Sequence, residues 1–398
     1  MHLAPFYISS HPRPVREAIE KYRHLIDANP VLTVDAAVFG SDSMDGLTKT
    51  EMPYLTQIVR EAAAEYIGGN AEDIALTDST TMGLSLVYNG LMLNPGEEML
   101  ATVHDFYPHH ESIRFAAERT GALTRRIALF DSFETISEEE IVVRIRKAIR
   151  PNTRTLGITW VHSSSGVKLP VRAIAAALDD INRKRDEQDR VLLIVDGVHG
   201  FGVEDENVAA LGCDVFISGT HKWVFGPRGT GIIWATKAAW ARMKPIIPSF
   251  IADDLWDAWK ANRLPVGVTN ATWMTCGGFK PFEHQWAMAD AFWFLRQIGR
   301  KRIAERTYVL NDQCKEGLAT MKGVKLYTPR GHHLSAGIIC FDIEGMRPDD
   351  IKRRLLEHNI IITKTPYRPS YARLAPSILS SPEEIDRVLR EIRTVVPA

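Results

Sequence analysis

Short apolar runs alternate with stretches of helical periodicity from the amino terminus to Trp234. The apolar runs predict strands at residues 74–76, 98–103, 123–127, 155–160, 191–195 and 215–217. The stretches with helical spacing predict helices at residues 14–29, 52–67, 81–91, 108–120, 137–149 and 171–185. This alternation is typical of an α/β fold whose mainly parallel sheet is covered by helices on both faces.

The pattern changes after Trp234. Residues 245–278 are rich in tryptophan and proline without a clean period, which predicts a long irregular connection near a ligand or a subunit boundary. A long amphipathic helix over residues 283–298, continuing to Met321, is expected to lead into a smaller α+β carboxy-terminal domain. The elements predicted there are strands at 325–327, 335–342 and 360–363 and helices at 348–357 and 382–395. The predicted division is a large domain of residues 30–290 and a small domain of residues 1–29 and 291–398.

The composition is that of an ordinary soluble globular protein. The chain has 398 residues, enough for two domains, with 45% hydrophobic and 24% charged residues. A net charge of −1 gives no basic field that would favour nucleic acid or an anionic membrane as a partner. The amino terminus lacks a signal-peptide pattern, and no apolar run approaches the length of a membrane span. The cysteines (Cys213, Cys276, Cys314 and Cys340) form no Cys-x-x-Cys pair, which indicates a reduced, cytoplasmic location.

A lysine and an acid each follow a buried apolar run. Lys222 comes shortly after the run 215–217 and precedes a glycine-rich return into a second apolar strand. Lost hydration at such a position lowers the pKa of the amine and frees it to form a Schiff base. Asp196 follows four aliphatic residues, where a carboxylate without a partner is costly to bury. Pyridoxal phosphate requires both groups, a lysine for its aldehyde and an acid that keeps its pyridine nitrogen protonated.

In this order and strand context, the pair resembles the class V aminotransferases, the cysteine desulfurase and isopenicillin N epimerase branch of pyridoxal phosphate enzymes. The resemblance spans nearly the whole chain and implies the type I fold of these enzymes. It implies that Lys222 is the Schiff-base residue and that Asp196 contacts the pyridine nitrogen. His199 matches the position that contacts the phenolic oxygen of the cofactor, although a structural histidine is an alternative.

A phosphate-binding loop is expected in the stretch 76–83, where a strand is followed by small hydroxyl residues and then a helix. Free N–H groups at the amino terminus of a helix attract a phosphate dianion. By the resemblance, the phosphate ligands are Thr80, Thr81, Thr220 and His221, together with Gly277 and Gly278 from the partner subunit of a homodimer. Many relatives have a threonine at the second of these two positions. This chain has Gly278 there, which can offer only its backbone.

Three further residues take roles from the resemblance. His104 matches the residue that stacks on the pyridine ring, where an aromatic platform fixes the orientation of the ring. Ser163 stands where desulfurases carry an asparagine. Arg373 matches the arginine whose planar fork binds the α-carboxylate of the substrate; a surface arginine on an edge strand is the alternative.

A metal site is a competing interpretation of the string His104, His109, His110 and Glu111. However, His109 and His110 point in different directions on any helix, and no second cluster completes a coordination sphere. We therefore predict that the protein binds no metal.

One feature of the desulfurases is missing. They carry sulfur on a cysteine of a mobile loop shortly before the carboxylate-binding arginine, and this chain has no cysteine between Ile360 and Arg373. The resemblance is greater to the isopenicillin N epimerase-like subgroup, which includes epimerases and C–S lyases of natural-product pathways. The substrate side chain is expected to contact residues 245–278, Phe106–Tyr107 and the loop 367–371.

The expected reaction begins when the amine of an amino acid displaces Lys222, after which the freed lysine removes the Cα proton. Loss of a β-sulfur group from a cysteine-derived substrate would then define a lyase, which is the favoured function. Reprotonation on the opposite face would define an epimerase, and reprotonation on the cofactor an aminotransferase. A cofactor-binding protein without turnover is the alternative of another class.

Overall fold

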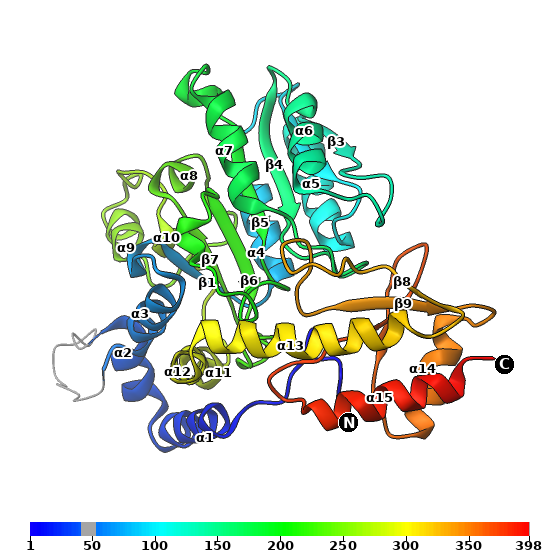
Figure 1. Ribbon diagram of the computed structural model, residues 1–398. Helices are drawn as coiled ribbons and strands as arrows, with labels where there is room; N and C mark the ends of the chain where they lie inside the picture. The colour runs from blue at the N-terminus through cyan, green and yellow to red at the C-terminus, as the bar shows by residue number, and fades with distance from the viewer. Residues whose placement is uncertain (41–52, 398) are drawn as a thin grey trace.

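The computed structural model describes residues 1–40 and 53–397. Its centre is a seven-stranded sheet in the order β1-β7-β6-β5-β4-β2-β3 (Figure 1). The strands are β1 (Ile74–Thr77), β2 (Glu98–Thr102), β3 (Leu123–Ile127), β4 (Thr153–Thr159), β5 (Leu192–Asp196), β6 (Val215–Gly219) and β7 (Gly231–Ala235). Strand β7 runs antiparallel to both of its neighbours, and all the other pairings are parallel, so the predicted mainly parallel sheet is confirmed.

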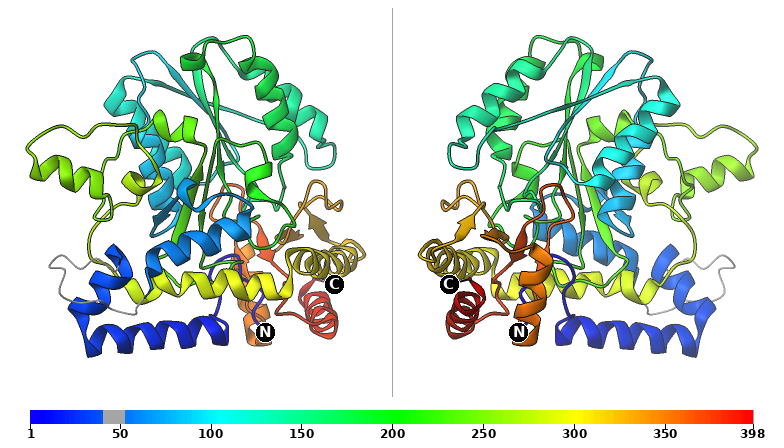
Figure 2. Two further views of the ribbon diagram at one scale, coloured as in Figure 1. Left: turned by 90° about the vertical axis from the view of Figure 1, so that its left-hand side faces the viewer. Right: turned by 90° about the vertical axis from the view of Figure 1, so that its right-hand side faces the viewer.

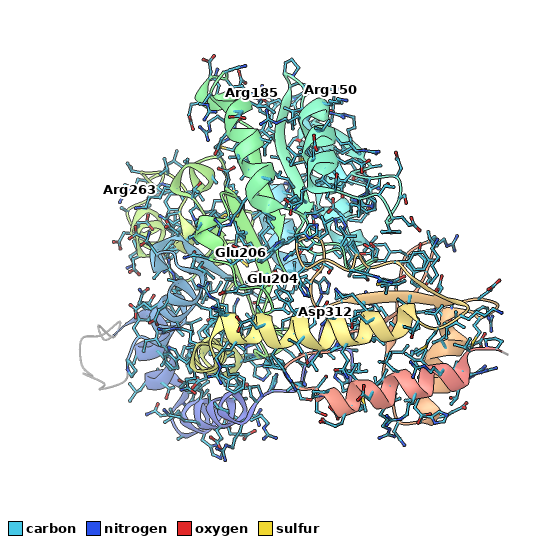
Figure 3. The ribbon with its side chains drawn as sticks, viewed as in Figure 1. Arg150, Arg185, Glu204, Glu206, Arg263 and Asp312 are labelled. Carbon is cyan, nitrogen blue, oxygen red and sulfur yellow. The ribbon has the colours of Figure 1, made fainter. Side chains whose placement is uncertain are left out.

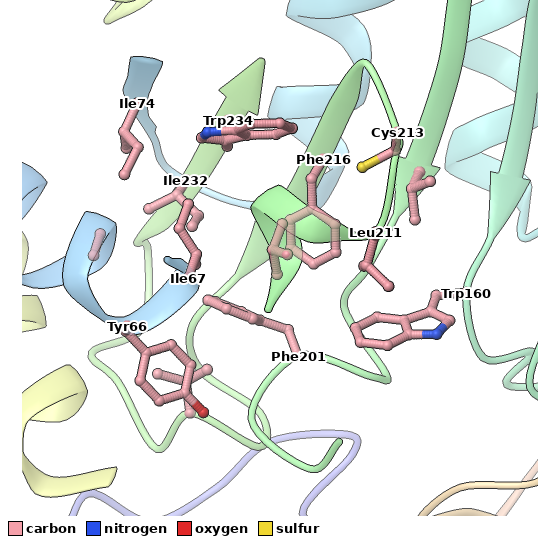
Figure 4. Packing of buried hydrophobic residues seen from close by; sticks show 14 of the residues in the cluster. Tyr66, Ile67, Ile74, Trp160, Phe201, Leu211, Cys213, Phe216, Ile232 and Trp234 are labelled. Atoms are coloured by element: carbon pink, nitrogen blue, oxygen red, sulfur yellow. The ribbon is translucent and has the colours of Figure 1, made fainter. Parts of the chain in front are cut away.

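Helices cover both faces of this sheet. One face carries α4 (Thr80–Gly90) and α5 (Tyr107–Thr120), and on this side Tyr88 packs in one apolar cluster with Ile194. The other face carries α3 (Leu55–Ile67), α6 (Glu138–Ala148) and α7 (Val171–Asn182). There the ring of Phe201 lies 5.5 Å from those of both Tyr66 and Phe216 (Figure 4). Two apolar clusters thus hold the sheet between helical layers, as the alternation predicted.

A smaller antiparallel sheet lies beside the first, in the order β10-β11-β9-β8. Its elements are β8 (Val324–Leu326), β9 (Ile339–Ile343), β10 (Thr363–Lys364), β11 (Ala372–Leu374), α14 (Pro348–Glu357) and α15 (Pro382–Val395). The long α13 (Arg300–Ala319) runs from the large sheet to this small one (Figures 1 and 2). Two strands begin later than predicted. The strand predicted at 335–342 begins at Ile339, and the strand predicted at 360–363 begins at Thr363.

The predicted continuous helix from residue 283 to residue 321 is three helices. They are α11 (Phe282–Trp286), α12 (Met288–Ile298) and α13. Gly299 separates the last two with a φ of +94°, a conformation that residues with a side chain rarely adopt. Apolar periodicity continues across this break, which explains why the pattern alone predicted one helix.

Other differences lie at the amino terminus and in the tryptophan-rich segment. Helix α2 (Pro30–Phe39) was not predicted, although Asn29 caps it by accepting the N–H of Leu32 at 3.3 Å. The predicted helix 52–67 begins at Leu55; its first residue lies outside the described residues. The segment 245–278 contains two short helices, α9 (Asp253–Lys260) and α10 (Ala271–Met274).

The amino terminus contacts both parts of the molecule. Helix α1 (Arg13–Ala28) packs against α2, α11 and α12, whereas Leu3 pairs with Ile361 and Ala375 beside the small sheet. The division into domains of residues 30–290 and of 1–29 with 291–398 stays a prediction.

A buried ion pair fastens the large sheet to α13. Lys168 donates to Glu204 at 2.6 Å, and the hydroxyl of Tyr308 on α13 donates to the same carboxylate at 2.7 Å. Figure 3 shows Glu204 between the sheet and α13. Among the helices of residues 1–40 and 53–397, none combines the length and the apolar character that crossing a membrane requires.

Candidate active site

A cavity of about 380 Å³ opens at the carboxyl ends of the parallel strands. It brings together eight of the residues predicted from the sequence, namely Thr80, Thr81, Ser163, Asp196, His199, His221, Lys222 and Arg373. These residues come from segments far apart in the chain. The carboxyl edge of an open parallel sheet is where such folds bind ligands.

Asp196 and Lys222 reach the cavity from neighbouring strands. Asp196 ends β5 with 5% of its surface exposed, and its Oδ1 accepts the N–H of Val198 at 3.1 Å. Burial raises the pKa of this carboxyl group. Lys222 follows β6, and burial lowers the pKa of its amine to about 8, with Asp196 opposing the shift and Arg373 adding to it. Near neutral pH, the neutral and nucleophilic form of Lys222 is therefore more populated than that of an ordinary lysine.

His199 lies beside this amine. Its Nε2 is 3.3 Å from Nζ of Lys222, whereas its buried Nδ1 has no hydrogen-bond partner in the part of the chain that the structure describes. Burial, together with the charges of Lys222 and Arg373, holds the pKa of His199 well below its usual value, so the ring is neutral. A buried ring nitrogen without a partner is a position that a bound molecule can satisfy.

The amino terminus of α4 forms one wall of the cavity. Ser79 caps the helix by accepting the N–H of Met82 at 3.1 Å, and Oγ1 of Thr80 accepts the N–H of Gly219 at 2.8 Å. N–H groups of a first helical turn have no partner within the helix. Burial, Lys222 and Arg228 lower the pKa of His221 to about 4, so its ring is neutral. This arrangement suits a phosphate dianion.

Arg373 forms another wall. It lies on β11, inside the small sheet between β10 and β9, with 7% of its surface exposed. Its Nε donates to Oγ1 of Thr363 and its Nη1 to the carbonyl of Ser163, both at 2.8 Å, and the guanidinium lies 4.6 Å from the ring centre of Phe6. No carboxylate of residues 1–40 or 53–397 forms a salt bridge with it. The alternative of a surface arginine on an edge strand is therefore wrong.

His104 does not reach the cavity. Its Nε2 accepts the N–H of Leu129 at 3.1 Å, and its ring stacks on Phe130 at 4.2 Å. Burial lowers its pKa to about 4. The turn after β2 brings Phe106 to the cavity instead, so the prediction that the His104 ring faces a ligand in this cavity is not met.

Thr220, Gly277 and Gly278 also lie away from this cavity. The hydroxyl of Thr220 is 2.5 Å from that of Thr230, within the loop that carries Lys222. Gly277 donates to the carbonyl of Pro248 at 2.9 Å, in a separate small hollow shared with Gly278. Because both glycines were expected to serve the site of a partner subunit, their prediction stays open.

Several other lining residues were not predicted, namely Phe6, Tyr7, Leu84, Pro108, Val198 and Pro366, whereas Ser79, which also lines the cavity, stands in the predicted phosphate loop. Phe6 and Tyr7 arrive because Ser9 donates its N–H to the carbonyl of His221 and its hydroxyl to that of Lys222, at 3.0 and 2.7 Å. The hydrophobic periodicity of the sequence carries no information about such a contact between distant segments. Phe106 stands in one of the loops expected to contact the substrate, whereas residues 245–278 do not line this cavity.

The donor set fits pyridoxal phosphate. A buried acid, a desolvated amine, a histidine nitrogen without a partner and the open end of a helix converge on one cavity. These are the contacts that the pyridine nitrogen, aldehyde, phenolic oxygen and phosphate of this cofactor require. Within the described residues, no group of three or more His, Cys, Asp or Glu side chains could hold a metal ion.

Comparison with known proteins agrees with this fit. The sequence model of the family "Aminotransferase class-V" matches residues 12–366. The chain is 26% identical over 357 residues to isopenicillin N epimerase of Streptomyces clavuligerus, covering 88% of this chain and 87% of that protein. It is 26% identical over 357 residues to a probable cysteine desulfurase of Halalkalibacterium halodurans, covering 86% and 77%.

A solved structure has the same fold. The cystine C–S lyase C-DES, in complex with its product cysteine persulfide, superposes with a TM-score of 0.82 at 19% identity, over 100% of this chain and 98% of that one. The sheet order, the cavity at its carboxyl edge and the family match lead to one conclusion. The chain belongs to the aminotransferase class-V family of pyridoxal phosphate-dependent enzymes.

Proposed function

We propose that this enzyme is a lyase that eliminates a sulfur leaving group from Cβ of a cysteine-derived amino acid in a biosynthetic pathway. The observation that carries the proposal is the strand order, which puts the desolvated base Lys222 after β6 on one side of Asp196 and Phe106 after β2 on the other. Elimination needs a base at Cα on one face of the substrate only. A cysteine-derived substrate agrees with the structural neighbour C-DES, which is a cystine C–S lyase.

The sheet order supports this arrangement. Lys222 follows β6, Asp196 ends β5 and Phe106 follows β2, and the strand order β6-β5-β4-β2 puts Lys222 and Phe106 on opposite sides of Asp196. A phenyl ring can stack on a pyridine ring but cannot donate a proton. We therefore assign Phe106 the platform role that the sequence suggested for His104.

Each of the remaining residues has a defined task. Bound pyridoxal phosphate supplies an aldehyde that condenses with amines and a ring that accepts electrons from Cα. Lys222 holds the cofactor and moves the proton at Cα, and Asp196 pairs with the pyridine nitrogen. Arg373 binds the α-carboxylate, which orients the bond to be broken. His199 and Ser163 contact the phenolic oxygen, and Thr80, Thr81 and His221 contact the phosphate.

No cysteine lines the cavity, and Cys213, Cys276, Cys314 and Cys340 are all buried as free thiols. Cys340 lies within β9, and burial raises the pKa of its thiol to about 12. A thiol held protonated in this way is a poor nucleophile. This supports release of the sulfur product without transfer to a protein thiol, and free thiols also suit a cytoplasmic location.

The proposed assembly is a homodimer. Trp259, Leu264 and Val266 expose 72%, 86% and 82% of their surfaces in the segment that leads to Gly277. Neighbouring exposed apolar side chains are typical of a surface that another protein covers. Burying them against a second copy would carry Gly277 and Gly278 toward the phosphate of the partner site.

Epimerisation is the second candidate, favoured by the similarity to isopenicillin N epimerase. The test incubates the loaded enzyme with a panel of amino acids, including cystine and cysteine thioethers, in deuterated water. Keto acid with released thiol is the expected result. Deuterium at Cα without loss of substrate would establish an epimerase, and keto acid that requires a second substrate an aminotransferase. Absence of all three products with every amino acid would favour a cofactor-binding protein without turnover.

A further inference from the structure

A chain of three buried polar side chains lies beneath the cavity without lining it. The hydroxyl of Tyr88 on α4 is 2.7 Å from Nε2 of His109 on α5, and Nδ1 of His109 is 3.9 Å from Oδ1 of Asp105. All three residues are buried. Only the first of these contacts is a hydrogen bond, and Nδ1 of His109 has no hydrogen-bond partner within the described residues. Polar groups are costly to bury, so their presence at this place calls for a role.

Asp105 connects this chain to the strand ends. Its carboxylate accepts the N–H of Thr102 at 2.7 Å and that of Thr159 at 2.8 Å, so one side chain ties the end of β2 to the end of β4. Thr159 pairs with Asp196 in the register of β4 and β5, and the N–H of Trp160 donates to the carbonyl of Asp196 at 2.9 Å. The polar chain therefore ends one strand away from Asp196.

The side chains share a face of the sheet with Asp196. Gly157, two residues before Thr159, pairs with Ile194, and Ile194 packs in the same apolar cluster as Tyr88. Because side chains alternate along a strand, Asp196 points to the same face as Ile194. A Cβ at Gly157 would lie 2.1 Å from the Tyr88 oxygen and 2.7 Å from Nε2 of His109, so only glycine leaves room for their contact.

The protonation states of these three side chains determine which nitrogen of His109 carries its proton. Burial raises the pKa of Tyr88 and lowers that of His109, so both groups are neutral. A phenol that donates to Nε2 leaves the imidazole proton on Nδ1, the nitrogen that lies near Asp105. Although burial opposes it, the pKa of Asp105 is lowered, and the Thr102 N–H that donates to its carboxylate contributes to this shift, so Asp105 is ionised.

Four groups influence the charge of Asp196 from the elements around it. Burial raises its pKa, and among its neighbours His109 opposes this most, followed by the Val198 N–H and Lys222, while Asp105 adds to it.

We propose that Tyr88, His109 and Asp105 form a positioning network behind Asp196, which fixes the end of β4 and so holds the Asp196 carboxylate toward the pyridine nitrogen of the cofactor. The proposal rests on the function proposed above for Asp196. The three residues touch neither substrate nor cofactor and act through Asp196 and the end of β4.

The test measures the pH midpoint of the visible absorbance of the cofactor-loaded enzyme, which reports the imine between Lys222 and the cofactor. A protonated pyridine nitrogen lowers this midpoint, because its positive charge disfavours a protonated imine. The His109→Leu variant should raise the midpoint by about one pH unit, in the same direction as Asp196→Asn. Tyr88→Phe should raise it less, and His109→Asn, which restores an N–H donor, should return it toward the wild-type value.

The matched control is Tyr66→Phe, which removes a buried phenol oxygen on the opposite face of the sheet and should leave the midpoint unchanged. A folded, cofactor-loaded His109→Leu enzyme with the wild-type midpoint would overturn the network while leaving the role of Asp196 intact. An unchanged midpoint in Asp196→Asn as well would overturn both proposals. If His109→Leu does not fold, Tyr88→Phe, which removes a single oxygen atom, carries the same test.

Discussion

Burial shifts the pKa values of the two central residues of the cavity in opposite directions. It lowers the pKa of Lys222 to about 8, which makes the amine available, and raises that of Asp196, which therefore gains from a cationic partner. These effects follow from placing a base and an acid on neighbouring strand ends. That placement could be predicted from the sequence, because Asp196 directly follows an apolar run and Lys222 comes shortly after another.

Asp196→Asn should retain the cofactor but lose more than about tenfold in turnover, because an amide cannot hold the pyridine nitrogen protonated. Absorbance measures cofactor content and product release measures turnover. The control is Asp257→Asn, an exposed carboxylate on α9. Activity within tenfold of wild type would mean that Asp196 is only a strand-end residue.

The lowered pKa of Lys222 predicts how cofactor capture by the apoenzyme depends on pH. Only the neutral amine attacks an aldehyde, so the capture rate should rise with pH and level off above about 8, whereas an ordinary lysine would titrate near 10.5. Because Asp196 raises the pKa of Lys222, Asp196→Asn should move the midpoint to lower pH. Stopped-flow absorbance measures both, and a rate still rising at pH 10 would contradict the shift.

Residues brought by long-range contacts could not be predicted in the same way. The turn after β2 decides whether His104 or Phe106 faces the cavity, and apolar periodicity carries no information about that turn. Phe6 depends on the contacts between Ser9 and the Lys222 loop. At the residue scale, the sequence predicted polar and charged residues at positions that are usually apolar. It did not predict the residues that only shape the cavity.

At the scale of elements, strands and most helices followed the apolar pattern, and the errors occurred where conformation depends on one backbone angle or cap. Gly299 ends α12 although apolar spacing continues into α13. Asn29 begins α2 directly after α1, where the pattern suggested a single helix end. These local signals are short, and the periodicity of longer segments outweighs them.

The connection between the large sheet and α13 yields a stability prediction. Tyr308→Phe removes the hydroxyl that donates to buried Glu204 at 2.7 Å, and it should lower the free energy of unfolding by about 1–2 kcal/mol. Denaturant titration measures this change. Tyr107→Phe, at a side chain with 67% of its surface exposed, should change it by less than about 0.5 kcal/mol. Equal effects of the two substitutions would show that the Glu204 contact does not stabilise the fold.

For the whole molecule, the exposed apolar residues around Trp259 predict a dimer whose loss removes activity. Trp259→Asp places a charge on this surface and should shift the protein from dimer to monomer in sedimentation velocity, with loss of turnover. Lys301→Asp, on the exposed side of α13, is the control and should remain dimeric. A fully active wild-type monomer would contradict the shared site.

The central claim is that Lys222 holds the cofactor in the cavity at the end of β6. Borohydride reduction of the purified enzyme followed by peptide mass spectrometry tests it most directly, because reduction fixes the link between the lysine and the cofactor. The modified peptide should carry pyridoxal phosphate on Lys222, and Lys222→Ala should fold but yield no fixed cofactor. A fixed adduct on another lysine, in the wild type or in Lys222→Ala, would contradict it.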